Sequence, residues 1–334
     1  MKMSNSISLY ALDAENGDCL LLVNHNTNYT VLIDSGPKSS RVSKNLAKTI
    51  KELISDREVD LAIVTHNDDD HIGGFKHFIS EGIEIKKFIF NHHDYIDRVL
   101  RQSRNVKVSL NQDVELNGMI NNKIIPLELS EDGYFLGKKF DEFNIDFRSP
   151  NREKLEKYST WIQKEKKKQR NIKVARNKAI LSIDEQREQA KDDSSFVEDR
   201  REPNGSSLAL DIAFYGYRIL LLGDAHPTTV IQSYEKSNPS KIKYDLVKLS
   251  HHGSDKNTNN ELLSIFECDH FLICSNSDNN HNHPSPTTIF RVLGNNNSKI
   301  YITKNSGKVN MLENSMGITF IKPDADYLEF KYEF

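Results

Sequence analysis

Side chains able to bind a metal are crowded into residues 64–74, which read VTHNDDDHIGG. His66, Asp68, Asp70 and His71 all lie in this segment, directly after an apolar run. Burying so many polar groups together is costly unless something binds them. Imidazole and carboxylate groups are ligands that suit Zn²⁺ and Mn²⁺. A helix N-terminus would use one aspartate, but it would not account for all four groups.

Three later segments also end an apolar strand with such groups. RILLLGDA carries Asp224, LVKLSHHGS carries His251 and His252, and SNSDNNHNHPSP carries His281 and His283. Each segment alone is more typical of a turn or a solvated loop. Because they follow one another in order, each at a strand end, together they indicate one metal site.

The spacing divides the first ligands between two ions. Alternate residues of an extended loop point to one side, so His66 and Asp68 would face one ion. Asp70 and His71, beyond the bend, would face a second, and a carboxylate such as Asp224 can bridge the two. Two divalent ions a few ångström apart clamp the attacking and leaving oxygens of a displacement and supply hydroxide near neutral pH.

The predicted elements place these groups at strand ends. ISLYALDA, DCLLLVN and YTVLIDSG are typical of strands, and SKNLAKTIKELIS has helical spacing. VDLAIVT, directly before the polar loop, is typical of a strand buried on both faces. Helices and strands alternate again after SSLALDIAFYGYRILLLGD, and GITFIKPDADYLEFKYEF predicts a terminal hairpin. In α/β sheets, binding sites collect at the carboxyl ends of strands.

Residues 151–203 differ in composition from the rest of the chain. Their high charge predicts two helices, about 151–170 and 174–192, and an acidic linker. We interpret them as an insertion or lid within a single domain that spans residues 1–334. Basic residues gathered between positions 164 and 178 could grip a phosphate backbone, although a solvated helix face explains them equally well. The candidate substrate-binding residues are Lys166, Lys167, Lys168 and Arg170.

Composition sets the broad class of protein. The chain has 334 residues, 37 % apolar and 28 % charged, as in an ordinary soluble globular protein. A net charge of -3 gives no global basic field, so nucleic-acid binding would need a local patch. Cys19, Cys268 and Cys274 form no CxxC pair and are expected to be buried free thiols. No signal peptide or membrane-spanning run is evident, which predicts a cytoplasmic protein without membrane contact.

The chain resembles the metallo-β-lactamase superfamily, and within it the branch typified by the hydrolase domain of the competence protein ComEC. That branch carries LDVGQGD, LIDAG, THPDADHIGG, NNSSLVL, LLTGDA, LKVPHHGS and NRYGHPSP. The corresponding segments here are LDAENGD, LIDSG, THNDDDHIGG, PNGSSLAL, LLLGDA, VKLSHHGS and NNHNHPSP, in the same order. The likeness covers most of the chain outside residues 151–200.

The resemblance implies an αββα four-layer sandwich with a binuclear site at one edge of its two sheets. By position, His66 and Asp68 resemble ligands of one metal, and Asp70 and His71 resemble ligands of the other. Asp224 resembles the bridging carboxylate.

Four more residues gain a role from the resemblance alone. One of His251 and His252 resembles the late histidine ligand, and their positions do not distinguish them. Asp34 resembles a buried aspartate that supports the metal loop. His283 resembles a pocket histidine that contacts substrate or donates a proton.

One position departs from the family pattern. The family usually has His-Pro after the strand that precedes the NSS motif, whereas this chain has Arg148 and Ser149 before a proline. The first metal would then lack a ligand or recruit His92, His93 or His226.

The resemblance and the aspartate-rich site together predict a function. The superfamily hydrolyses β-lactams, thioesters, phosphodiesters and nucleic acids, and the ComEC-like branch leans towards phosphodiesters. We therefore expect a soluble hydrolase with two divalent ions, Zn or Mn, most simply a phosphodiesterase or nuclease that uses a metal-bound hydroxide. Asp70 and His283 are its candidate catalytic residues, and nucleic acid is a candidate partner. The alternatives are a hydrolase of small phosphoesters or esters and a regulatory or binding module with a partly degraded metal site.

Overall fold

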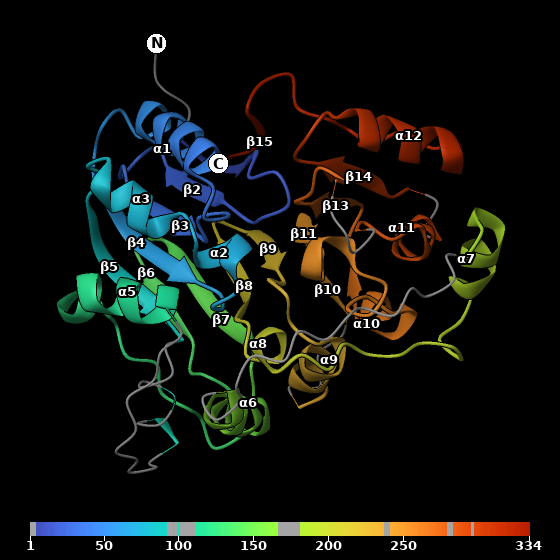
Figure 1. Cartoon of the computed structure of the whole chain (residues 1–334), viewed down its shortest axis with the longest axis horizontal. Helices are drawn as coiled ribbons and strands as arrows, with labels where there is room; N and C mark the ends of the chain where they lie inside the picture. Colours follow the sequence, from blue (N-terminus) through green and yellow to red (C-terminus); the bar gives the residue numbers. More distant parts are fainter. Residues whose placement is uncertain are drawn as a thin grey trace.

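Two β-sheets pack face to face, and helices cover the outer face of each (Figure 1). A computed structural model describes residues 5–91, 96, 99–100, 111–165, 181–236, 241–278, 283–294 and 297–334. One apolar cluster fills the space between the sheets, and two others lie between each sheet and its helices. The predicted αββα sandwich is confirmed.

The first sheet has the strand order β15-β1-β2-β3-β4-β5. Alternation along a strand explains its two apolar faces. On β1, Ile7 and Leu9 face the second sheet, while Tyr10 and Leu12 face the helices. Its strands are β1 (Ser6–Leu12), β2 (Leu20–Asn24), β3 (Thr30–Ile33), β4 (Val59–Val64), β5 (Ile85–Phe90) and β15 (Tyr327–Glu333).

The second sheet has the order β14-β13-β11-β9-β8-β7-β6. Its β8–β9 hairpin turns at Tyr215 and Gly216, both with positive φ, as a type I′ hairpin turn requires. Two short strands, β10 (Ile242–Lys243) and β12 (Phe266–Glu267), pair separately. The strands of the sheet are β6 (Lys138–Phe140), β7 (Phe143–Ser149), β8 (Ala209–Phe214), β9 (Tyr217–Leu221), β11 (Leu246–Lys248), β13 (His270–Ile273) and β14 (Lys299–Ile302).

Each outer layer consists of amphipathic helices. Val42, Leu46 and Ile50 recur at helical spacing on α1 and bury one face of it against the first sheet. The helices beside the first sheet are α1 (Ser40–Leu53), α2 (Asp69–Ile72), α3 (Phe75–Ser80), α5 (Asn111–Ile120) and the short η1 (Asn121–Lys123). Those beside the second are α9 (Pro227–Glu235), η2 (Ser250–Gly253), α10 (Asn260–Ser264), α11 (Pro286–Leu293) and α12 (Gly307–Met316).

The charged segment between β7 and β8 contains α6 (Arg152–Glu165), α7 (Ile183–Gln189) and α8 (Glu202–Gly205). Leu155, Tyr158 and Ile162 of α6 are buried in the cluster between the sheets, so this helix is part of the core. Arg187 of α7 lies over the Phe290 ring of α11, 4.7 Å from its centroid. Residues 166–180, which include the end of the first predicted helix and the start of the second, lie outside the described residues.

The expected terminal hairpin is wrong. Only β15 forms, and it pairs with β1, whereas residues 317–326 contain no strand. Phe320 is buried instead against the helices of the second sheet, and its backbone N–H donates to Glu313 Oε1 of α12 at 2.7 Å. Ile321 forms a single parallel bridge with Tyr301 of β14. The run therefore contacts α12, a helix that the sequence interpretation missed, and the edge strand of the second sheet.

The structure bears on two features expected from composition, the state of the cysteines and the membrane-spanning potential of the helices. All three cysteines, Cys19, Cys268 and Cys274, are buried and free. In the part of the chain that the structure describes, no helix has the length and apolar character needed to cross a membrane.

Candidate metal centre

The metal-capable residues meet where strand ends of both sheets come together. The loop after β4 carries His66, the helix α2 that follows it carries His71, and the turn after β9 carries Asp224. Leu208 N donates to Thr65 O at 3.0 Å, which joins the two sheets at this edge. Each sheet therefore supplies part of one site.

Glycine makes the turn at Asp224 possible. Gly223 has a φ of 50°, and a Cβ added there would lie 2.5 Å from Ser207 Oγ. The same Ser207 hydroxyl accepts a hydrogen bond from Asp224 N at 3.0 Å. The turn can therefore close tightly enough to hold the carboxylate against the two histidines.

His66, His71 and Asp224 form the centre of the site. One ligand atom from each lies within 4.8 Å of the others. His71 Nε2 is 3.3 Å from Asp224 Oδ1, and His66 Nε2 is 3.7 Å from Asp224 Oδ2. Among the described residues, His66 Nε2, His71 Nε2 and Asp224 Oδ1 have no hydrogen-bond partner although they are buried. Buried polar atoms normally have partners, and this donor set fits a divalent cation.

Both rings are held from behind at Nδ1. His71 Nδ1 is 2.8 Å from Asp34 Oδ2, and His66 Nδ1 is 3.1 Å from Thr65 Oγ1. The Thr65 hydroxyl donates to Asp34 Oδ2 at 2.7 Å, so it accepts from the His66 ring. Hydrogen bonds of this kind fix the tautomer and leave Nε2 free to bind a metal. The structure thus places Asp34 directly behind the ring of His71 and, through Thr65, behind the ring of His66.

The electrostatics of the site favour a cation. Burial, aided by the charge of His71, lowers the pKa of His66 to about 3, so its ring is a neutral ligand. Burial alone would lower the pKa of His71, but the carboxylates of Asp224, Asp18 and Asp34 raise it well above its ordinary value. The carboxylates gathered here stabilise positive charge, which a metal ion would supply.

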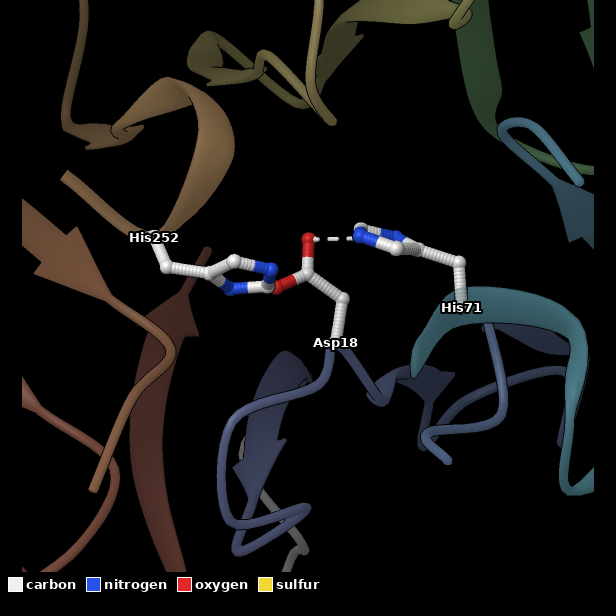
Figure 2. A group of neighbouring side chains, drawn as sticks. All are labelled: Asp18, His71 and His252. Carbon is white, nitrogen blue, oxygen red and sulfur yellow. Dashed lines mark ion pairs between the residues drawn. The ribbon is translucent and has the colours of Figure 1, made fainter. Parts of the chain in front are cut away.

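Asp18 lies between the rings of His71 and His252 (Figure 2). It faces their Nδ1 atoms, at 3.8 Å and 3.4 Å. The Nδ1 atom of His252 already contacts Cys274 O at 2.8 Å, and Asp18 forms a buried ion pair with Lys248. Asp18 therefore supports the two ligand rings from behind. The sequence interpretation missed this role, although Asp18 ends the LDAENGD motif of the resemblance.

The two neighbouring histidines of η2 both face the site. His252 Nε2 is 3.1 Å from Asp70 Oδ2, and His251 Nε2 is 3.6 Å from Asp224 Oδ2. Burial alone would lower the pKa of His252, but hydrogen bonding to Asp18 and Asp70 raises it to about 10. Asp70 thus contacts the centre through His252, and among the described residues neither Asp70 nor His251 belongs to a group of clustered ligand atoms.

Asp68 lies at the edge of the centre. Its Oδ2 atom is 3.0 Å from Arg201 Nη2, and it does not join either group of clustered ligand atoms among the described residues. Burial raises the pKa of Asp68, and the charge of Arg201 partly opposes this. The Arg201 side chain is 57 % exposed, so a solvent-accessible cation stands beside Asp68.

His226, one of the possible replacement ligands, lies outside the two groups of clustered ligand atoms. His226 is buried, but its Nδ1 atom is 2.7 Å from Lys154 Nζ and its Nε2 atom is 3.9 Å from Asp199. It is absent from the ligand groups found in the described part of the chain. His283 lies beside His251, with ring centroids 5.0 Å apart. The predicted site residues that lie outside the described residues are His92, His93, Lys166, Lys167, Lys168, Arg170 and His281.

Comparison with known proteins finds one family model that matches part of the sequence. The sequence model of the metallo-beta-lactamase superfamily matches residues 12–87, which contain Asp18, Asp34 and the loop after β4. No curated protein matches the sequence.

Solved structures resemble the chain at low identity. The metallo-beta-lactamase fold protein YhfI from Bacillus subtilis is 8 % identical, with a TM-score of 0.44, over 97 % of this chain and 99 % of that one. CmlA, a diiron beta-hydroxylase from Streptomyces venezuelae, is 12 % identical, with a TM-score of 0.43, over 99 % of this chain and 54 % of that one. The family model therefore matches the part of the chain that carries His66 and His71, and the αββα sandwich with its buried donor set agrees with that match.

Proposed function

We propose that the chain is a metal-dependent phosphodiesterase of the ComEC-like branch, with nucleic acid as its substrate class. The observation that carries the proposal is the buried cluster of His66 Nε2, His71 Nε2 and Asp224 Oδ1, without hydrogen-bond partners among the described residues. A metallo-β-lactamase fold with such a cluster suggests a metal-dependent hydrolase. Two bound divalent ions, Zn or Mn, would supply a nucleophile at neutral pH and neutralise charge on a phosphoryl group.

The residues around the cluster would share the remaining tasks. Asp224 can hold both ions because its two oxygens face different histidines. Asp70 would help to hold the second ion beside His252. His283 would donate a proton to the leaving oxygen, as its position beside His251 allows.

Arg201 supports an anionic substrate. Its guanidinium is exposed to solvent and pairs with Asp68 at 3.0 Å. When Asp68 contributes to a metal ion, the same guanidinium is available to a phosphate oxygen, which arginine binds well. The basic residues Lys166, Lys167, Lys168 and Arg170 lie outside the described residues, and their contact with a nucleic-acid backbone stays a prediction from the sequence.

The test is metal content measured beside hydrolysis. Protein incubated with Zn²⁺ or Mn²⁺ should retain about two equivalents and cleave bis(p-nitrophenyl) phosphate and DNA or RNA. His66→Ala and Asp224→Ala should lose metal and activity together, whereas His25→Ala, far from the site, should keep both. An enzyme that holds two ions but cleaves only thioesters or β-lactams would contradict the phosphodiesterase.

A further inference from the structure

We infer that His251 and His252 are both metal ligands, one for each ion, and that His251 supplies the ligand that residues 148–149 lack. The inference rests on the proposed binuclear site and assigns its missing coordination. A histidine pair shared between two ions would explain how the first ion is held without the usual histidine.

Neither Arg148 nor Ser149, which stand where the family usually has His-Pro, can act as the missing histidine ligand. The Arg148 guanidinium donates to Asp211 Oδ2 through Nε at 2.9 Å and Nη2 at 2.7 Å, and it lies over the Tyr234 ring. Ser149 is fully buried, and its hydroxyl has no hydrogen-bond partner among the described residues. Arg148 is therefore committed to a structural network, and Ser149 carries no imidazole.

The backbone of η2 turns two successive histidines toward the same site. His251 and His252 have φ values of 48° and 53°, in the left-handed region that bulky residues rarely adopt. Each such residue costs about 1–3 kcal/mol, and strain of this kind concentrates at functional sites. In an extended chain, neighbouring side chains would point to opposite sides. Here both Nε2 atoms face carboxylates of the centre, Asp224 and Asp70 respectively.

The shortest contact behind the His251 ring favours one tautomer. Asn257 is fully buried, and its Nδ2 atom donates to Asp224 O at 3.2 Å. Its Oδ1 atom is therefore the one that faces His251 Nδ1, at 3.1 Å, and it can only accept. The carboxylate of Asp199 is a second acceptor, 3.6 Å from Nδ1, while the donor Asn204 Nδ2 approaches the same atom at 3.3 Å. The shorter contact with Asn257 favours a neutral ring with its proton on Nδ1, in which Nε2 presents a lone pair to the site. The carbonyl of Cys274 does the same for His252.

Distances to Asp224 divide the ligands into two sets. His66 Nε2 and His251 Nε2 are 3.7 Å and 3.6 Å from Asp224 Oδ2, whereas His71 Nε2 is 3.3 Å from Oδ1. His252 faces Asp70 instead. His66, His251 and Oδ2 would hold the first ion, and His71, His252, Asp70 and Oδ1 would hold the second. His251 N also donates to Gly223 O at 2.9 Å, which fixes the ring beside Asp224.

The experiment counts ions in matched histidine variants. Wild type, His251→Ala, His252→Ala and the control His270→Ala, whose ring contacts Tyr301 away from the site, are loaded with Zn²⁺ or Co²⁺, dialysed and measured by plasma mass spectrometry. We expect about two equivalents in wild type and the control, and about one in each of the other variants. The Co²⁺ absorption bands lost in His251→Ala should differ from those lost in His252→Ala.

Three results would overturn the inference. The first is a His251→Ala variant that holds two equivalents with wild-type affinity. The second is loss of the same Co²⁺ bands in both variants, and the third is wild type that binds neither metal. His251→Gln, checked by circular dichroism, guards against misfolding and should behave as His251→Ala does. Wild type with two ions but no phosphodiester cleavage would overturn the proposed function and leave this inference standing.

Discussion

Asp34 shows how a single buried residue can control the whole centre. It accepts hydrogen bonds from Thr65 N and Thr65 Oγ1, and its Oδ2 atom lies 2.8 Å from His71 Nδ1. Through Thr65 it also reaches the ring of His66. Both histidines of the metal loop therefore depend on one carboxylate that does not itself face the ions.

Asp34→Asn should weaken metal binding by about 10–100-fold, because the partners behind ligand rings contribute that much to affinity. The substitution keeps the shape of the side chain but removes its charge and one acceptor. Competition with a chromophoric chelator measures the change. Asp184→Asn, on the exposed face of α7, is the control and should bind as wild type does. Equal affinity in both variants would mean that Asp34 does not support the metal loop.

Residue type and local spacing predict only part of the site. His66, Asp68, Asp70 and His71 stand out because four candidate ligands follow one apolar run. Asn257 and Lys248 do not stand out, because asparagine and lysine are common residues and their partners are remote in sequence. Lys248 pairs with Asp18 from the opposite sheet, a contact that only the sandwich creates. The tautomers of the ligand rings, and with them the sharing of His251 and His252, depend on such contacts.

At the scale of elements, α2 and α3 follow β4 closely because two glycines let them approach the loop after β3. A Cβ at Gly74 would lie 2.2 Å from Ser35 O, and one at Gly73 would lie 2.3 Å from Lys38 N. Ser35 N in turn donates to His71 O at 2.7 Å. The position of the metal loop thus depends on this close backbone contact.

Gly74→Ala should destabilise the fold by about 1–3 kcal/mol, the usual effect of overpacking, and should also lower metal affinity. Urea unfolding and chelator competition measure the two effects. Gly118→Ala is the matched control, because a Cβ there meets nothing within 4 Å and alanine favours the helix α5. Unchanged stability in Gly74→Ala would show that α2 can shift freely.

A buried polar network joins the central strands of the second sheet. Asp211 of β8 binds Arg148 of β7 and Arg218 of β9, and it accepts from Tyr244 OH at 2.8 Å. Asp211 is 1 % exposed, so its removal would leave two guanidinium groups without their counter-charge. This network also explains why Arg148 stands where the family usually has His-Pro. Its role there is to hold adjacent strands together.

Asp211→Ala should cost about 3–5 kcal/mol of unfolding free energy at pH 7, as breaking a buried ion pair does. Burial alone would raise the pKa of Asp211, but Arg218 and Arg148 hold it below its ordinary value. Its contribution is therefore present above an unfolded pKa of about 3.9 and is lost as pH falls below it. Urea unfolding at pH 7, 5 and 3 should show the gap between wild type and variant narrowing only at the lowest pH. A gap that stays constant would contradict this role.

Element prediction succeeded where apolar periodicity is strong and failed where tertiary contacts decide. The apolar run of β4 and the helical spacing of α1 identified both elements. Residues 318–321 are just as apolar, but Phe320 is buried beside α12, and the expected strand does not form. A sequence window cannot show which neighbour an apolar run will contact.

At the scale of the whole molecule, the centre joins two halves of the chain. His66, Asp70 and His71 come from the segment beside the first sheet, whereas Asp224, His251 and His252 come from loops of the second. The α6 helix adds Leu155 and Tyr158 to the cluster between the sheets. A bound ion would therefore link the same two halves that the central core holds together.

Metal binding should accordingly raise the unfolding temperature of the whole chain in one transition. Ion at about 100 times its dissociation constant should add about 2.7 kcal/mol, and chelation should lower the midpoint by several degrees. Calorimetry with and without chelator, beside near- and far-ultraviolet circular dichroism, measures this. Asp224→Ala should lose the shift, because its carboxylate lies between the ligands from the first sheet and His251 of the second. If metal stabilised only one of two separate transitions, its ligands would come from one sheet alone, and the ion could not join the two halves.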